Sequence, residues 1–162
     1  MTRLLKIAPA IILSAYITTG NLWAFRPALM RPLSLAGLLL MGAALWGKGR
    51  REGSSAIDKG FLIYMGCSAF IFWALSDQWI GIAMHFTAGL LYAILFIVVA
   101  LPAAATGTYF TEFFAKKRTP EIFWDTPLFK AINRNMTWVW AAIFALSAGL
   151  TLVPVLVIGK PG

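Results

Sequence analysis

The sequence predicts an all-α fold, a polytopic membrane helical bundle with about five transmembrane helices. Of its 162 residues, 60% are hydrophobic and only 12% are charged, whereas soluble domains are about half apolar and about a quarter charged. A bilayer removes the need to cover so much apolar side chain with so few charges. The apolar residues form five segments separated by charged gaps. We therefore expect a single transmembrane domain over residues 1–162.

The basic residues are distributed unevenly among the gaps, and this predicts an orientation. Only Arg26, Arg31 and Lys160 fall on one side of the expected membrane. By the positive-inside rule the richer side is cytoplasmic, which predicts a cytoplasmic N-terminus and an extracytoplasmic C-terminus. Attraction to anionic lipid explains the net charge of +8 without a nucleic-acid partner. The richer side holds Arg3, Lys6, Lys48, Arg50, Arg51, Lys59, Lys116, Lys117, Arg118, Lys130 and Arg134.

The first two spans are expected over residues 4–25 and 33–46. No small-x-small cleavage site interrupts the first, so we expect a retained helix rather than a signal peptide. Residues 26–32 contain two prolines and two arginines, which predicts a stiff extracytoplasmic turn. The second span is shorter than the roughly 20 residues a helix needs to cross. Local thinning or snorkelling would compensate, and a half-spanning hairpin with the first segment is the alternative.

The next connection, residues 48–60, is rich in glycine and serine, so we expect it to be mobile and cytoplasmic. The third span is expected over residues 61–75 and the fourth over 79–101. The reversal between them, Ser76-Asp77-Gln78, contains no basic residue and is therefore predicted to be extracytoplasmic.

Residues 103–135 interleave aromatic and basic side chains before the fifth span at 136–158. This pattern predicts a cytoplasmic interfacial segment with its rings in the acyl boundary and its cations toward anionic lipid. Asn135 is a candidate cap for the fifth span, and Arg134 is expected to hold a lipid phosphate or Glu112. The residues expected to contact membrane lipid or a protein partner are Phe113, Phe114, Lys116, Lys117, Arg118 and Arg134.

Ala141, Ala145 and Gly149 are spaced four apart in the fifth span. Small residues at this spacing let two helix backbones approach closely, so we predict a packing stripe. A helix of the same chain is the favoured partner, and a second subunit of a homo-oligomer is the alternative.

Candidates for chemistry are few. His85 is the only histidine, and we expect it to be hydrogen-bonded inside the bundle, with proton handling or ligand contact as the alternative. One histidine provides neither a zinc site nor bis-histidine haem ligation, so no metal or cofactor is expected. Cys67 is expected to be a packing residue. All six acidic residues fall in gaps or at segment ends, which disfavours an ion-coupled carrier.

The stretch from Thr126 to Phe144 resembles the final span of the bacterial intracellular septation protein A family. The family's final span has an Asn, then a Trp-Ala pair and a Phe, and the same residue types stand here at Asn133, Trp140-Ala141 and Phe144. The reversal Ser76-Asp77-Gln78-Trp79 is similar to the family's turn between the third and fourth helices. The family's Lys-Pro-Thr feature has no counterpart in Gly81-Ile82-Ala83-Met84-His85. The resemblance implies a non-enzymatic inner-membrane protein that contacts cell-envelope or division machinery.

The sequence thus favours a non-enzymatic integral inner-membrane protein that acts by binding, as an envelope or division factor or as an accessory subunit of a membrane complex. One alternative is a small-molecule or lipid carrier with a path past His85, Thr87 and Tyr92. Another is a membrane enzyme that uses Glu112, Glu121 or Asp125 of the cytoplasmic segment.

Overall fold

The fold was analysed in a computed structural model that describes residues 2–22 and 27–158, with side chains described except at 2–6, 20–22, 27, 51–52, 81–82, 85 and 152–158. Throughout the described residues the regular structure is helical, which confirms the predicted all-α class. The elements are α1 (Thr2–Leu22), α2 (Pro27–Glu52), α3 (Ala56–Ala74), α4 (Asp77–Thr106), α5 (Phe110–Ala115), the 3₁₀ helix η1 (Glu121–Phe123) and α6 (Pro127–Ile158).

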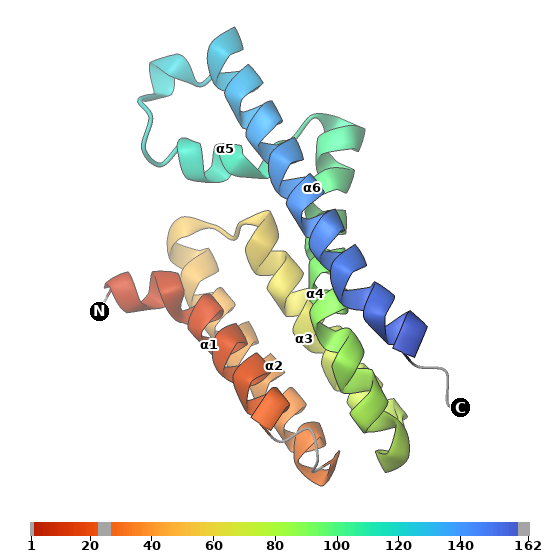
Figure 1. Cartoon of the computed structure of the whole chain (residues 1–162). Coiled ribbons are helices and arrows are strands. Elements are labelled where there is room, and N and C mark those ends of the chain that lie inside the picture. Colours follow the sequence, from red (N-terminus) through yellow and green to blue (C-terminus); the bar gives the residue numbers. More distant parts are fainter. Residues whose placement is uncertain (1, 23–26, 159–162) are drawn as a thin grey trace.

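The long helices form a bundle in which neighbours in sequence are neighbours in space (Figure 1). α1 packs on α2, α2 on α3, and α3 on α4. The most extensive contact joins α4 and α6, and α5 lies across α6 beyond the end of the main bundle. Residues 107–126, with α5 and η1, are called the connector below.

Among the described residues, three helices are long and apolar enough to cross a membrane: Ala28–Arg50, Ala56–Ala74 and Phe86–Thr106. The apolar stretch described in α1, Ile7–Thr19, is shorter, and the side chains of α6 are described only as far as Thr151. The helices therefore fit a membrane protein, but the structure supports three crossings where the sequence predicted about five.

The second predicted span was too short at both ends. α2 is a 26-residue helix that includes most of the predicted stiff turn at 26–32. Pro27 occupies the first helical position, where its missing amide donor costs little. Arg31 lies within the helix and points its guanidinium at the end of α3, where Nε donates to the Phe72 carbonyl at 3.1 Å and Nη2 to the Leu75 carbonyl at 2.9 Å. α2 therefore has the length of a full crossing, contrary to the hairpin alternative.

The predicted mobile connection at 48–60 is mostly helical. α2 continues to Glu52 and α3 begins at Ala56, so only three residues lie between the helices. Ser55 and Asp58 form a capping box at the start of α3, which satisfies amide donors that a helix start leaves unpaired. Lys48 reaches this cap from α2, with Nζ 2.7 Å from the Asp58 carboxylate. The turn is short and held at both ends.

The predicted interfacial segment at 103–135 is also shorter than expected. α4 continues to Thr106, and α6 begins at Pro127 rather than near Met136. The Thr126 hydroxyl accepts a hydrogen bond from the Phe129 amide at 3.3 Å, so Thr126 caps α6 and Asn135 does not. The sequence prediction placed this helix start too late, because the first two turns of α6 include polar and charged residues and precede the apolar run that begins at Met136.

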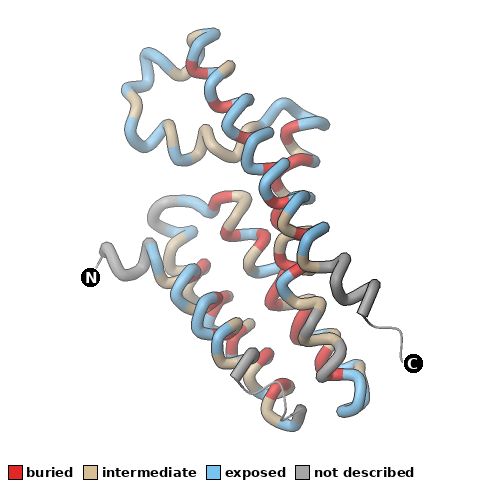
Figure 2. The backbone as a smooth tube through the Cα atoms, viewed as in Figure 1, coloured by how far each residue is buried: buried red, intermediate tan, exposed pale blue. Residues whose placement is uncertain are grey.

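Buried side chains line the facing sides of the helices, and the outer faces are exposed (Figure 2). The core includes Met41, Tyr64, Met65, Phe72 and Val99, each at most 1% exposed. The helices approach closely at Gly60, where a Cβ would lie 2.9 Å from Leu95 Cδ2. Large apolar side chains such as Leu39, Phe70 and Trp73 cover the outside, as expected of a surface that faces lipid.

Candidate functional site

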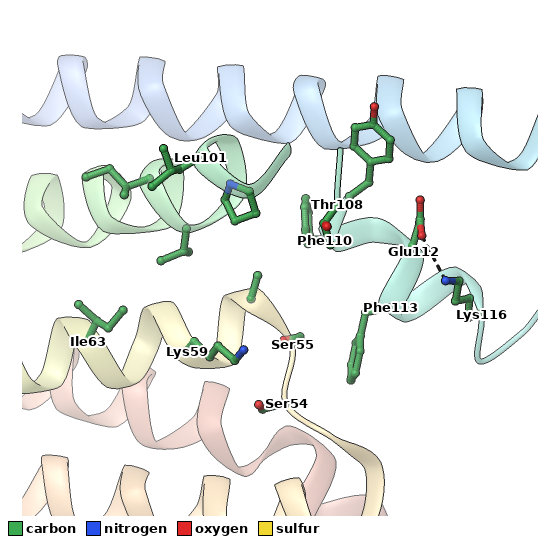
Figure 3. A pocket seen from close by; sticks show the side chains of 15 residues that line it. Ser54, Ser55, Lys59, Ile63, Leu101, Thr108, Phe110, Glu112, Phe113 and Lys116 are labelled. Atoms are coloured by element: carbon green, nitrogen blue, oxygen red, sulfur yellow. Dashed lines mark ion pairs between the residues drawn. The ribbon is translucent and has the colours of Figure 1, made fainter. Parts of the chain in front are cut away.

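A groove of about 620 Å³ lies between the start of α3, the end of α4 and α5 (Figure 3). We call it the connector groove. Its volume falls among pockets that hold small ligands, which are about 300–1,000 Å³. Its polar lining residues are Ser54, Ser55, Lys59, Thr108, Glu112 and Lys116. Its apolar lining includes Ile63, Ile97, Val98, Leu101, Pro102 and Phe113.

The position of α5 depends on the chain reversal that precedes it and on contacts with α6. α4 ends at Gly107, which has a φ of 65°, a conformation that favours glycine. The Thr111 hydroxyl then donates to the Asn133 carbonyl of α6 at 2.9 Å and lies 3.0 Å from the Thr137 hydroxyl. Asn133 and Thr137 are both buried. α5 is therefore fixed to α6 by a polar contact inside an otherwise apolar interface.

The other end of the groove is closed by Phe113 against the turn between α2 and α3. Gly53 in that turn has a φ of 75°, and a Cβ there would lie 3.5 Å from Cε2 of the Phe113 ring. A side chain at residue 53 would therefore meet backbone strain, whereas its Cβ would be in ordinary van der Waals contact with the ring. The positive φ of the turn is what favours glycine at residue 53.

The floor of the groove is continuous with the lipid-facing surface of α3 and α4. Ile63, Ile97 and Leu101 line the groove, and they are 47%, 54% and 63% exposed. All three lie on helices that are long enough to cross a membrane. The groove therefore opens sideways, toward the surface that the bilayer would cover.

Basic side chains predominate at the polar end of the groove. Lys59 is exposed, and no ion pair to it occurs in the part of the chain that the structure describes. Lys116 Nζ lies 3.3 Å from the Glu112 carboxylate and 5.4 Å from the centre of the Trp124 ring. Two lysines and one glutamate leave the groove with one net positive charge, which suits an anionic group.

The structure brings only some of the predicted contact residues together. Phe113 and Lys116 line the connector groove, and Lys117 lies over the Phe113 ring, 4.2 Å from its centre. Arg118 and Arg134 are exposed and do not line the groove. Arg134 was expected to hold Glu112, but the Glu112 carboxylate pairs with Lys116.

Phe114 does not line the connector groove. It lines a second hollow of about 390 Å³ with Ile57, Phe110, Thr111, Trp140 and Phe144. Its ring packs edge-on against Phe113, with centroids 5.3 Å apart. α5 thus lines two hollows, of which only the connector groove is lined by cationic side chains.

Only one residue of the predicted stripe of small residues is buried in the bundle. Ala141 is 1% exposed, whereas Ala145 and Gly149 lie on the exposed side of α6. The buried residues of α6 follow a different line, through Asn133, Thr137, Ala141, Phe144 and Ala148. The internal partner is therefore contacted without Ala145 or Gly149.

The side chain of His85 lies outside the described residues, so its predicted role stays a prediction. Near it in α4, the Thr87 hydroxyl donates to the Met84 carbonyl at 2.7 Å, and Tyr92 is half-buried. Among the residues with described side chains, no group of three metal-binding residues comes together.

Sequence reasoning missed Lys59 and the walls contributed by α3 and α4. A signal was present, because Ser55, Lys59 and Ile63 are spaced four apart and so share one helix face. The residues of α4 that complete the groove follow no pattern that separates them from other lipid-facing residues.

Comparisons with protein-family models, curated proteins and solved structures found no match for this chain. The resemblance to the septation protein A family is therefore neither supported nor opposed by them.

Proposed function

We propose that this is a multi-pass membrane protein that acts by binding rather than by catalysis, and that the connector groove is its binding element. One observation supports this most directly: an apolar floor that joins the lipid-facing surface ends beneath basic side chains. Such a site is suited to a ligand with one apolar part and one anionic part.

The proposed topology has five crossings, formed by α1 to α4 and α6, in a bacterial inner membrane. α1 lies along α2, and α6 lies along α4 (Figure 1). α4 has 30 residues and α6 has 32, which gives lengths of about 45 and 48 Å. Both exceed a hydrocarbon thickness of about 30 Å. We place the connector in the cytoplasm because of the positive-inside rule. The end of α4 and the start of α6, which flank the connector, lie on the same side.

Two of the three acidic residues of the connector, Glu112 and Asp125, support binding over catalysis. Glu112 pairs with Lys116, and Asp125 pairs with Lys130 at 3.1 Å. An acid–base pair would need two titratable groups facing one substrate position. Neither ion pair has that arrangement, because each acid faces a cation. In the cell the binding role would be that of an envelope or division factor, or of an accessory subunit of a membrane complex.

The proposal is tested by lipid-dependent stability of the full-length protein in a neutral detergent. Phosphatidylglycerol, which is anionic, should raise the unfolding temperature more than zwitterionic phosphatidylcholine, because a ligand that binds only the folded state stabilises it. The double variant K59Q/K116Q, which removes the two lysines that line the groove, should lose most of this difference. K117Q/R118Q is the matched control, because it removes the same number of charges from connector residues that do not line the groove. Equal effects of the two lipids on the wild-type protein would refute the proposal.

A further inference from the structure

The connector groove has a polarity gradient along both of its long walls. On α3 the residues that face it run from Ser55 through Lys59 to Ile63. On α4 they run from Ile97 to Leu101, and Thr108 follows beyond the helix end. Because α3 begins where α4 ends, both gradients increase toward the connector (Figure 3). An occupant therefore meets hydrocarbon at one end of the groove and charge at the other.

From this gradient we propose that the connector groove holds one acyl chain of an acidic phospholipid from the surrounding bilayer, with the lipid phosphate at the polar end of the groove, beside Lys59. This inference rests on the proposed function, since it names the ligand of the same groove. The chain would lie along Ile63, Ile97 and Leu101, and the rest of the lipid would remain in the bilayer.

The exposed floor argues that the occupant comes from the bilayer. Ile63, Ile97 and Leu101 are each about half exposed or more, and they lie on helices of membrane-spanning length. In a bilayer these side chains contact lipid tails without any specific ligand. A lipid enters the groove by moving sideways along this surface. A water-soluble ligand would first have to displace the bilayer lipids that cover it.

The charges of the groove match a phosphodiester. Lys59 has no ion-pair partner among the described residues. Lys116 is shared with Glu112, but this pair is 3.3 Å long and its side chains are 40% and 22% exposed, so it contributes little to stability. The net charge of the two lysines and the glutamate is one positive unit, equal and opposite to that of a phosphodiester. Lysine binds phosphate through charge-assisted hydrogen bonds.

The experiment uses the full-length protein in lipid nanodiscs with a phosphatidylglycerol that has a photoreactive diazirine near the end of one acyl chain. After illumination, labelled peptides are identified by mass spectrometry. We expect labelling concentrated at Ile63 and at 97–101, reduced by excess unlabelled phosphatidylglycerol and not by phosphatidylcholine. Uniform labelling of all lipid-facing helices would overturn the inference.

Matched variants separate the head group from the tail. Lys59→Gln should reduce groove labelling about tenfold, since a charge-assisted hydrogen bond is lost, and Lys59→Arg should retain it. Ile97→Trp and Leu101→Trp should each fill the groove and abolish the labelling. Ile143→Trp is the control for the added ring, because Ile143 is exposed on α6 outside the groove. Groove labelling that survives both tryptophan variants would refute the inference.

The two proposals can fail separately. If phosphatidylglycerol raises the unfolding temperature selectively, and K59Q/K116Q removes this effect, but its chain labels the groove no more than the other helices, the head group binds at the polar end of the groove without an acyl chain along the floor. The inference then falls and the proposed function stands. If phosphatidylglycerol has no selective effect on stability and no selective labelling, both fall. Labelling at the groove that phosphatidylcholine competes away equally well would show a groove that does not select a head group, which also overturns the inference.

Discussion

Lys48 and Asp58 form a buried ion pair across the turn between α2 and α3. Lys48 Nζ lies 2.7 Å from both carboxylate oxygens of Asp58, and the two side chains are 11% and 6% exposed. Asp58 Oδ2 also accepts hydrogen bonds from the Ser55 amide and hydroxyl, each at 2.9 Å. Lys48 lies in the last turns of α2 and Asp58 in the first turn of α3, where each charge is favoured by the helix dipole.

Asp58→Asn should lower the free energy of unfolding by about 3–5 kcal/mol, because it leaves the Lys48 ammonium buried without its counter-charge. Lys48→Met should cost less, because Asp58 keeps its two hydrogen bonds from Ser55. The measurement is thermal unfolding in one detergent at a fixed scan rate. Lys130→Gln breaks an exposed pair with Asp125 and should change little. An Asp58→Asn protein as stable as this control would contradict the prediction.

Arg31 should stabilise the end of α3 through three contacts. Its guanidinium donates to the Phe72 and Leu75 carbonyls and lies 2.8 Å from Asp77 Oδ1. Helix ends leave such carbonyls without partners, and a lysine cannot reproduce the planar fork. Arg31→Met should cost about 2 kcal/mol, and Arg31→Lys should recover only part of it.

Hydrogen exchange provides the local readout for Arg31. Amides of 72–76 should exchange faster in Arg31→Met, while those of α5 should not change. Asp77→Asn is the control, because the Asp77 side chain is 62% exposed and its pairing contributes little. The account of Arg31 would be wrong if Asp77→Asn and Arg31→Met accelerated exchange equally.

Adding a side chain should have opposite effects on stability at two glycines of α3, Gly60 and Gly66. A Cβ at Gly60 would lie 2.9 Å from Leu95 Cδ2 and 3.1 Å from Val98 Cγ2, whereas a Cβ at Gly66 would meet nothing within 4 Å. Gly66→Ala should stabilise the helix by up to about 1 kcal/mol. Gly60→Val should destabilise it by about 1–3 kcal/mol through overpacking against α4. Thermal unfolding of both variants in one detergent measures the difference, and a Gly60→Val protein as stable as wild type would disprove the close approach.

The sequence predicted the helical class and the order of the long helices because apolar runs and charged gaps are properties of local composition. It misjudged α2 and α6 because helix ends depend on capping and on distant partners. Arg31 looked like a turn residue, yet its guanidinium is satisfied by carbonyls more than 40 residues away. Thr126 caps α6 among polar residues, where no change in hydropathy marks a helix start.

The same limit applies to the connector groove. Phe113 and Lys116 were predictable because aromatic and basic residues alternate within one short segment. Lys59 and Leu101 could not be assigned to the groove, because their role depends on how α3 and α4 meet α5. That meeting is set by the Gly53 turn and by Thr111, neither of which stands out in the sequence.

Ala141 and Ala145 should differ in their tolerance of a larger side chain. Ala141 is 1% exposed between α6 and α4, so Ala141→Leu should cost about 1–3 kcal/mol by overpacking. Ala145 is exposed, so Ala145→Leu should leave the unfolding temperature unchanged. If a second copy packs on this face, Ala145→Leu should instead reduce dimer formation, measured by single-molecule photobleaching in nanodiscs. Destabilisation of the monomer by Ala145→Leu would show that α6 is rotated from the orientation described.

Thr111 should determine whether α5 stays on α6. Its hydroxyl supplies the hydrogen bonds that join α5 to Asn133 and Thr137, and valine keeps its shape without them. Thr111→Val should therefore cost about 1 kcal/mol and should accelerate amide exchange in 110–116 while leaving α3 unchanged. Thr151→Val is a matched control, because the Thr151 hydroxyl bonds only within α6, to the Ser147 and Ala148 carbonyls. Since α5 forms one wall of the connector groove, the stabilisation by phosphatidylglycerol should fall in Thr111→Val and persist in Thr151→Val. Unchanged exchange at 110–116 in Thr111→Val would mean that apolar packing alone fixes α5.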